Sequence, residues 1–213
     1  MIIKICGITT PEDAIACFKA GADIVGLVHY PPSPRHVEAT EICEIVTAVR
    51  GRQTGPPKHI ALVVADQYPK LPRATHQLIR YLQNYGDKKL KCSDSFQSPI
   101  HVIRDYKTFT RLLDSTTSPQ REFYCLEMSK GTLPGGNGAA WDWSMAKPFC
   151  ERYPTFIAGG ITPENVADVI RLANPYGIDV SSGVESTPGV KDMDKVKRLI
   201  DNVHQALIFG EKP

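Results

Sequence analysis

Short apolar runs alternate with helical spacing along most of this chain, and that alternation limits the possible folds more than any other feature. Strand-like runs at 2–5, 23–29 and 60–64 are separated by apolar residues at helical spacing over 11–20 and 39–49. Strands and helices in regular succession require parallel strands joined by helical crossovers. The sequence therefore predicts an α/β fold.

The same rhythm continues to the end of the chain with one weak region. An amphipathic segment at 71–82 follows the third strand, and 83–99 does not have the pattern of a well-buried strand. The other expected elements are strands at 100–103, 123–127, 155–158 and 178–181 and helices at 144–152, 163–173 and 192–208. Eight units favour a closed (β/α)8 TIM barrel, irregular around strands four and five, although counting alone leaves a doubly wound open sheet as an alternative. Since no linker divides the chain, we expect one domain, 1–213.

Charge and cysteine spacing narrow the class of protein. The formal net charge is only +2, and acidic and basic residues are interspersed. Such a charge produces no electrostatic field strong enough to suggest binding to nucleic acid or to a membrane surface. No apolar run reaches the length of a membrane span and no signal-peptide core is present, so we expect a cytoplasmic protein. The six cysteines have neither CxxC spacing nor histidines at ligand distance, which predicts no zinc site and no disulfide framework.

Two turns that follow apolar strands predict an anion site. Gly159 and Gly160 let a ligand approach the backbone, and Ser182 and Gly183 add amides and a hydroxyl after the next strand. In a (β/α)8 barrel, the loops after strands seven and eight lie together and frequently bind phosphate. The sequence therefore predicts a phosphorylated small-molecule substrate.

Several motifs, in a fixed order, carry a family resemblance. They are Lys-Ile-Cys-Gly-Ile-Thr at 4–9, Gly-Leu-Val at 26–28, Ser-Pro-Arg at 33–35, Gly-Gly-Asn-Gly at 135–138, Trp-Asp-Trp at 141–143, Ala-Gly-Gly at 158–160, Pro-Glu-Asn-Val at 163–166, Asp-Val-Ser-Ser-Gly-Val-Glu at 179–185 and Pro-Gly-Val-Lys-Asp at 188–192. Together they cover nearly the whole chain, which resembles the phosphoribosylanthranilate isomerases of tryptophan biosynthesis.

The resemblance implies an Amadori rearrangement of N-(5-phosphoribosyl)anthranilate to the 1-deoxyribulose 5-phosphate adduct. This needs an acid for the furanose ring oxygen and a base for the C2 proton of the sugar. The family's base corresponds to Cys6, which could serve if neighbouring donors or dipoles lowered its pKa. Arg35 is expected to bind the anthranilate carboxylate, because its planar fork suits bidentate binding.

The chain departs from the family's pattern on the active face. Where the family has an acidic aspartate after strand six, this chain reads Cys-Leu-Glu-Met at 125–128. Glu127 is the expected acid; a shift of one position would put Met128 there and leave no acid. Tyr85 stands where a histidine is usual after strand four, and we expect it among the substrate-binding residues.

The phosphate is expected on Gly136 and Gly138 after strand six, together with the two turns after strands seven and eight. No cofactor or metal is implied, because positioned acids and bases suffice for the proton transfers. Two alternatives remain open. One is a diverged paralogue acting on another phosphorylated amino-sugar or aryl-amine adduct, and the other is a non-catalytic phosphate-binding barrel. The sequence leaves a homodimer open.

Overall fold

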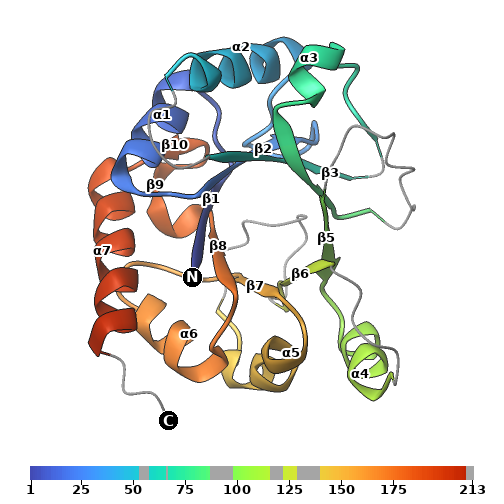
Figure 1. Ribbon diagram of the computed structural model, residues 1–213, viewed down its shortest axis with the longest axis vertical. Helices are drawn as coiled ribbons and strands as arrows, with labels where there is room; N and C mark the ends of the chain where they lie inside the picture. The colour runs from blue at the N-terminus through green and yellow to red at the C-terminus, as the bar shows by residue number, and fades with distance from the viewer. Residues whose placement is uncertain (53–57, 66, 87–97, 116–121, 129–139, 210–213) are drawn as a thin grey trace.

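The chain forms a closed barrel of eight parallel strands, β8 pairing back onto β1 (Figure 1). The computed structural model describes residues 1–52, 58–65, 67–86, 98–115, 122–128 and 140–209. The strands are β1 (Ile2–Cys6), β2 (Ile24–His29), β3 (His59–Val64), β4 (Ile79–Asn84), β5 (Ser98–Ile103), β6 (Phe123–Leu126), β7 (Thr155–Ala158) and β8 (Gly177–Val180). Closure confirms the predicted barrel and rejects the open sheet.

Helices surround the barrel on the outside (Figure 1). They are α1 (Pro11–Ala20), α2 (Ala39–Arg50), α3 (Arg73–His76), α4 (Tyr106–Asp114), η1 (Trp143–Ala146), α5 (Lys147–Arg152), α6 (Val166–Ala173) and α7 (Met193–Phe209). After β8 the chain makes one 3-10 turn, η2 (Ser182–Val184), and an antiparallel pair, β9 (Glu185–Thr187) and β10 (Val190–Lys191). No helix in the described part of the chain combines the length and apolar character that crossing a bilayer demands.

Local sequence explains why the first helix matches its prediction at both ends. The Thr10 hydroxyl accepts a hydrogen bond from the Asp13 amide, and Pro11 occupies the first turn, where its missing N–H costs nothing. Gly21 ends the helix in a left-handed conformation. Such caps are readable from sequence because donor and acceptor lie within one turn.

The core has two layers. A small cluster fills the barrel interior, formed by Ile24, Ala61, Ile100, Cys125, Phe156 and Ala158. A much larger cluster lies between the strands and the helices, and the inward positions of α2 belong to it. Polar groups are also buried: Lys4 and Gln83 have no exposed surface, and Asp179 is 7% exposed. These polar residues come from β1, β4 and β8, and both Lys4 and Gln83 donate to Asp179.

The region around strands three to five differs from the prediction. The amphipathic segment at 71–82 holds only the four-residue α3, and β4 begins within it at Ile79. Gln83 was assigned to a poorly buried stretch, yet it is a fully buried residue of β4. Its Nε2 donates to the Tyr85 hydroxyl and to Asp179 Oδ2, whereas its Oε1 is buried without a partner among the described residues. Hydrophobic patterning does not detect such a tertiary environment. The β3–β4 register shifts between Ile60 and Ala61, whereas the irregularity was expected around strands four and five.

Two further boundaries or elements were not predicted correctly. The helix expected at 163–173 begins at Val166, because Thr162 and Asn165 form a turn in which the Asn165 Oδ1 accepts from the Thr162 amide at 2.8 Å. The sequence analysis also missed α4, which begins where Asp105 accepts a hydrogen bond from the Thr108 amide.

Candidate active site

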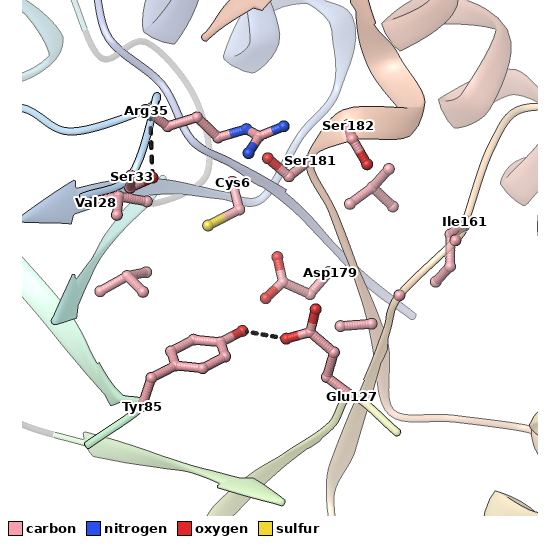
Figure 2. A pocket seen from close by; sticks show the side chains of 15 residues that line it. Cys6, Val28, Ser33, Arg35, Tyr85, Glu127, Ile161, Asp179, Ser181 and Ser182 are labelled. Carbon is pink, nitrogen blue, oxygen red and sulfur yellow. Dashed lines mark hydrogen bonds between the residues drawn. The ribbon is translucent and has the colours of Figure 1, made fainter. Parts of the chain in front are cut away.

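The carboxyl ends of the strands surround one pocket of about 550 Å³, including its open mouth (Figure 2). Its lining consists of Cys6, Val28, Ser33, Arg35, Val63, Tyr85, Glu127, Ala158, Gly159, Gly160, Ile161, Asp179, Val180, Ser181 and Ser182. Among the described residues, the pocket therefore brings together most of the predicted site.

Cys6 ends β1 and points its thiol into the pocket (Figure 2). Space for the sulfur comes from Gly26 on β2, where a Cβ atom would lie 2.6 Å from Sγ. Burial raises the pKa of the Cys6 thiol, and the Lys4 ammonium offsets only part of that rise. The expected lowering toward neutrality is therefore absent, because desolvation outweighs the nearby cation.

Glu127 follows β6 directly, is 2% exposed and projects into the same pocket. Burial raises the pKa of its carboxyl, opposed by a hydrogen bond that the Tyr85 hydroxyl donates to Oε2 at 2.9 Å. Met128 instead packs against the hydrophobic core and is outside the pocket lining. A carboxyl group, and not a thioether, thus faces the cavity after β6.

Tyr85 enters the pocket as a partner of Glu127. Its amide donates to the Val64 carbonyl at 2.8 Å, which fixes the chain just beyond β4. Burial, and next the Glu127 carboxylate, raise the pKa of Tyr85 well above its ordinary value. The phenol therefore stays protonated and remains a hydrogen-bond donor.

A buried network underlies the pocket. The Lys4 Nζ donates to Asp179 Oδ2 at 2.7 Å, and the Gln83 Nε2 lies 3.3 Å from the same oxygen and 3.2 Å from the Tyr85 hydroxyl. Burial disfavours the Lys4 charge, but Asp179 and the neighbouring cysteines Cys6 and Cys125 together raise the pKa of Lys4 above its ordinary value. Asp179 Oδ1 is buried without a hydrogen bond in the described structure and belongs to a residue that lines the pocket.

Arg35 lies in the loop between β2 and α2 with its guanidinium largely buried. Its Nε and Nη2 donate to the two Glu185 carboxylate oxygens at 2.8 and 2.6 Å, and Lys191 Nζ donates to Glu185 Oε1 at 2.6 Å. Burial alone would raise the pKa of Glu185, but these two cations hold it below its ordinary value. Gly7 makes the arrangement possible, since a Cβ there would lie 2.4 Å from Arg35 Cδ.

The predicted anion turns meet at the pocket. Gly159 and Gly160 both have positive φ (92° and 70°), and the amides of Gly159, Gly160 and Ser182 donate to none of the described residues. The Ser181 Oγ is likewise buried without a partner in this part of the chain. Backbone donors and a hydroxyl around one space suit an anion.

The remaining predicted glycines are not among the residues that line the pocket in the described structure. Gly183 is not in the pocket lining; a Cβ there would lie 1.8 Å from the Ile161 carbonyl oxygen, so glycine permits close packing of two loops. Gly136 and Gly138 lie outside the described residues.

Sequence reasoning did not select Lys4, Asp179 or Glu185 as site residues, although all three lie within its motifs. A charged residue inside an apolar strand was the available signal for Lys4 and Asp179, because such a residue needs a buried partner. Glu185 gave no such signal, since it does not lie inside an apolar strand-like run.

Comparisons with known proteins agree with this geometry. The family model for N-(5'phosphoribosyl)anthranilate (PRA) isomerase matches residues 3–202. An N-(5'-phosphoribosyl)anthranilate isomerase of Desulfatibacillum aliphaticivorans is 40% identical over 216 residues, which cover 95% of this chain and 93% of the relative.

Solved structures give the same picture. Phosphoribosyl anthranilate isomerase of Thermotoga maritima matches with a TM-score of 0.79 at 28% identity, covering 96% of this chain and 100% of that one. A structure of such an isomerase in complex with reduced 1-(o-carboxyphenylamino)-1-deoxyribulose 5-phosphate matches with a TM-score of 0.75 at 27% identity, with the same coverage. Monomers made from the dimeric Thermotoga maritima isomerase match with a TM-score of 0.72 at 27% identity, covering 96% and 99%.

Proposed function

Because the chain belongs to the N-(5'-phosphoribosyl)anthranilate isomerase family and catalyses that family's reaction in tryptophan biosynthesis, we propose that Cys6 and Glu127 carry its two proton transfers. The reaction opens the furanose ring of the substrate and moves a proton away from C2 of the sugar. One group must protonate the ring oxygen and another must accept the C2 proton. The side chains of Cys6 and Glu127 both line the same pocket (Figure 2).

Glu127 is the proposed acid. As the bond from C1 to the ring oxygen breaks, its proton goes to that oxygen, and the nitrogen lone pair forms a C1–N double bond. Cys6 then takes the C2 proton, giving an enolamine. The enolamine gains a proton at C1 and loses the proton of its C2 hydroxyl to become the 1-amino-2-ketose, so the conversion is a net isomerisation. Atoms and charge balance without a co-reactant. The observation that carries this assignment is the buried Glu127 carboxyl in the pocket, whose pKa is raised by burial.

The two ionisations have an unusual relation. Burial raises the pKa of both groups. Since the ordinary values are about 4.3 for a carboxyl and about 8.5 for a thiol, we take Glu127 to be the group that loses its proton first. The productive form has a Cys6 thiolate and a protonated Glu127. It is then less populated than the form with a Cys6 thiol and an ionised Glu127. Both forms hold one proton and are populated together between the two pKa values.

We assign Tyr85 a positioning role toward Glu127. Its hydroxyl donates to Oε2, which fixes the carboxyl rotamer and leaves the other oxygen to carry the transferred proton. The same hydrogen bond lowers the pKa of Glu127 against the effect of burial. Tyr85 thus limits how far the carboxyl departs from its ordinary acidity.

The ends of the substrate have separate partners. Arg35 uses Nε and Nη2 on Glu185, which leaves Nη1, without a partner in the described structure, for the anthranilate carboxylate. The amides of Gly159, Gly160 and Ser182 suit the phosphate. Asp179 Oδ1 suits a hydroxyl or N–H group of the opened sugar, because it is buried and lacks a donor among the described residues.

The test follows the fluorescence decrease as freshly generated phosphoribosylanthranilate is consumed. Cys6→Ser and Glu127→Gln should each lower kcat by a factor of roughly 100 or more, with little change in phosphate affinity. The matched control is Glu122→Gln. Glu122 pairs with His101 and is outside the pocket lining, so this variant should retain activity. Full activity in Glu127→Gln would move the acid to another residue.

Two broader features stay proposals. A homodimer is supported by the dimeric Thermotoga maritima relative, and light scattering at several concentrations would test it. A location in the cytoplasm fits a biosynthetic enzyme of this family and is tested by fractionation of the source cells.

A further inference from the structure

Beside the pocket, two histidines and a glutamate converge where nothing in the reaction uses them. The side chains of His29, His36 and Glu38 each place one ligand atom so that all three atoms lie within 4.8 Å of one another. The two imidazole centroids are 5.0 Å apart. Imidazole nitrogens with a carboxylate are a donor set typical of zinc and similar divalent transition metals.

The backbone holds these residues in place. Val28 and His36 form a parallel bridge, the Val37 amide donates to the Val28 carbonyl at 2.9 Å, and the His36 amide donates to the Ser33 carbonyl at 3.0 Å. His29 ends β2, and this bridge sets His36 beside it. The backbone therefore fixes His29 and His36 at the edge of the barrel, and the exposed Glu38 side chain at the start of α2 completes the cluster.

Hydrogen bonding leaves the right atoms available. His29 Nδ1 lies 2.9 Å from the Val37 carbonyl oxygen, which can only accept, so Nδ1 carries the hydrogen and the Nε2 lone pair is free to bind a metal. A backbone carbonyl on the other ring nitrogen is the usual support of a metal-binding histidine. The hydrogen bond to Val37 therefore fixes both the orientation of the His29 ring and its tautomer.

His36 provides the second, independent sign. Both of its ring nitrogens are buried and make no hydrogen bond with the described residues, although the side chain is only 16% exposed. Nε2 lies 3.1 Å from Glu38 Oε1 but is not aligned for a hydrogen bond with it. Two ligands on a tetrahedral zinc ion lie about 3.3 Å apart, so this pair is already at the spacing of a shared ion.

The geometry points to a zinc-class divalent metal site formed by His29, His36 and Glu38, with water completing the coordination. The 67% exposed Glu38 side chain gives the ion a path from solvent. Arg35 precedes His36 directly and lines the pocket, so a bound ion would hold the segment that carries it. The site is separate from the acid and base, and the inference does not depend on their assignment.

The test uses chelator-treated protein and zinc chloride, in competition with a chromophoric chelator. We expect one equivalent to bind with a Kd on the order of micromolar, and His29→Gln and His36→Gln each to weaken binding at least about tenfold. His204→Gln, on the exposed face of α7, is the matched control and should leave Kd unchanged. Equal affinity in all three variants, or no saturable binding by the native chain, would overturn the site.

A second measurement separates this site from the thiols and does not require a variant in the cluster. Cobalt(II) bound to imidazole and carboxylate shows visible bands without a sulfur-to-cobalt charge-transfer band. We expect that spectrum, and we expect Cys6→Ser to leave it unchanged. A charge-transfer band, or loss of binding in Cys6→Ser, would assign the metal to cysteine and reject the proposed ligands.

Discussion

The two sides of the pocket hold their carboxylates in different ways. On the side of β8, β1 and β2, Glu185 is held by Arg35 and Lys191, and Asp179 by Lys4. On the side of β4 and β6, the one hydrogen-bond partner of the Glu127 carboxyl among the described residues is the neutral hydroxyl of Tyr85. Cations keep a buried carboxylate ionised, whereas burial beside a phenol leaves it able to hold a proton.

This difference explains a division of labour. The paired side holds its carboxylates in ion pairs, and Arg35 on that side suits an anionic end of the substrate. The unpaired side contains the group whose pKa burial raises, and it suits proton donation. The groups that surround a buried carboxyl therefore say more about its ability to donate a proton than its position along the barrel does.

The largest effect should come from removing a cation on the paired side. Lys4→Met leaves Asp179 buried without its counter-ion, which should lower the free energy of unfolding by about 3–5 kcal/mol. Urea denaturation measures it. The double variant Lys4→Met with Asp179→Asn should recover much of the loss, because no charge is then left unpaired. A single variant as stable as the native chain would show that the pair is not needed for stability.

Crowding the base should have the next largest effect. In Gly26→Ala the new Cβ would lie 2.6 Å from the Cys6 Sγ, so the thiol must move. We expect kcat to fall by about 10- to 100-fold with a smaller change in KM, since a misplacement near 1 Å has effects of this size. Gly51→Ala is the control, because the nearest atom to its Cβ is 3.7 Å away. Equal kcat in both variants would contradict the role of Cys6.

Removing the phenol on the unpaired side should give the smallest change, visible in the pH profile. Tyr85→Phe deletes the hydrogen bond that lowers the pKa of Glu127, so that pKa should rise further. The rising, acid-side limb of kcat/KM should move up by about one pH unit. Tyr81→Phe, on the same strand but outside the pocket lining, should leave the limb in place. An unmoved limb in Tyr85→Phe would mean that the phenol does not act through Glu127.

The sequence predicted the two sides unequally, for physical reasons. Strands β7 and β8 with their glycine turns were predicted because their signals are local: apolar runs, then Gly159 and Gly160. Arg35 and Glu127 were placed in the site because they follow expected strands of a barrel, and their roles came from the family resemblance; both line the pocket.

What the sequence missed depends on contacts between distant residues. The buried Gln83 donates to Asp179 on β8, 96 positions away, and Tyr85 donates to a carboxylate 42 positions away. The ion pair of Arg35 with Glu185 crosses 150 positions. No spacing rule within one helix or strand reports such pairs, so the roles of these residues became clear only in the folded chain.

The most direct test of the central claim is kcat/KM against pH for the native chain and Glu127→Gln. In the native chain the active form holds one proton, so kcat/KM should fall as pH rises through the raised pKa of Cys6. In Glu127→Gln only the thiolate is required, and the much lower kcat/KM should instead rise through the same range. Opposite slopes would support Cys6 as base and Glu127 as acid. Parallel profiles would contradict that assignment.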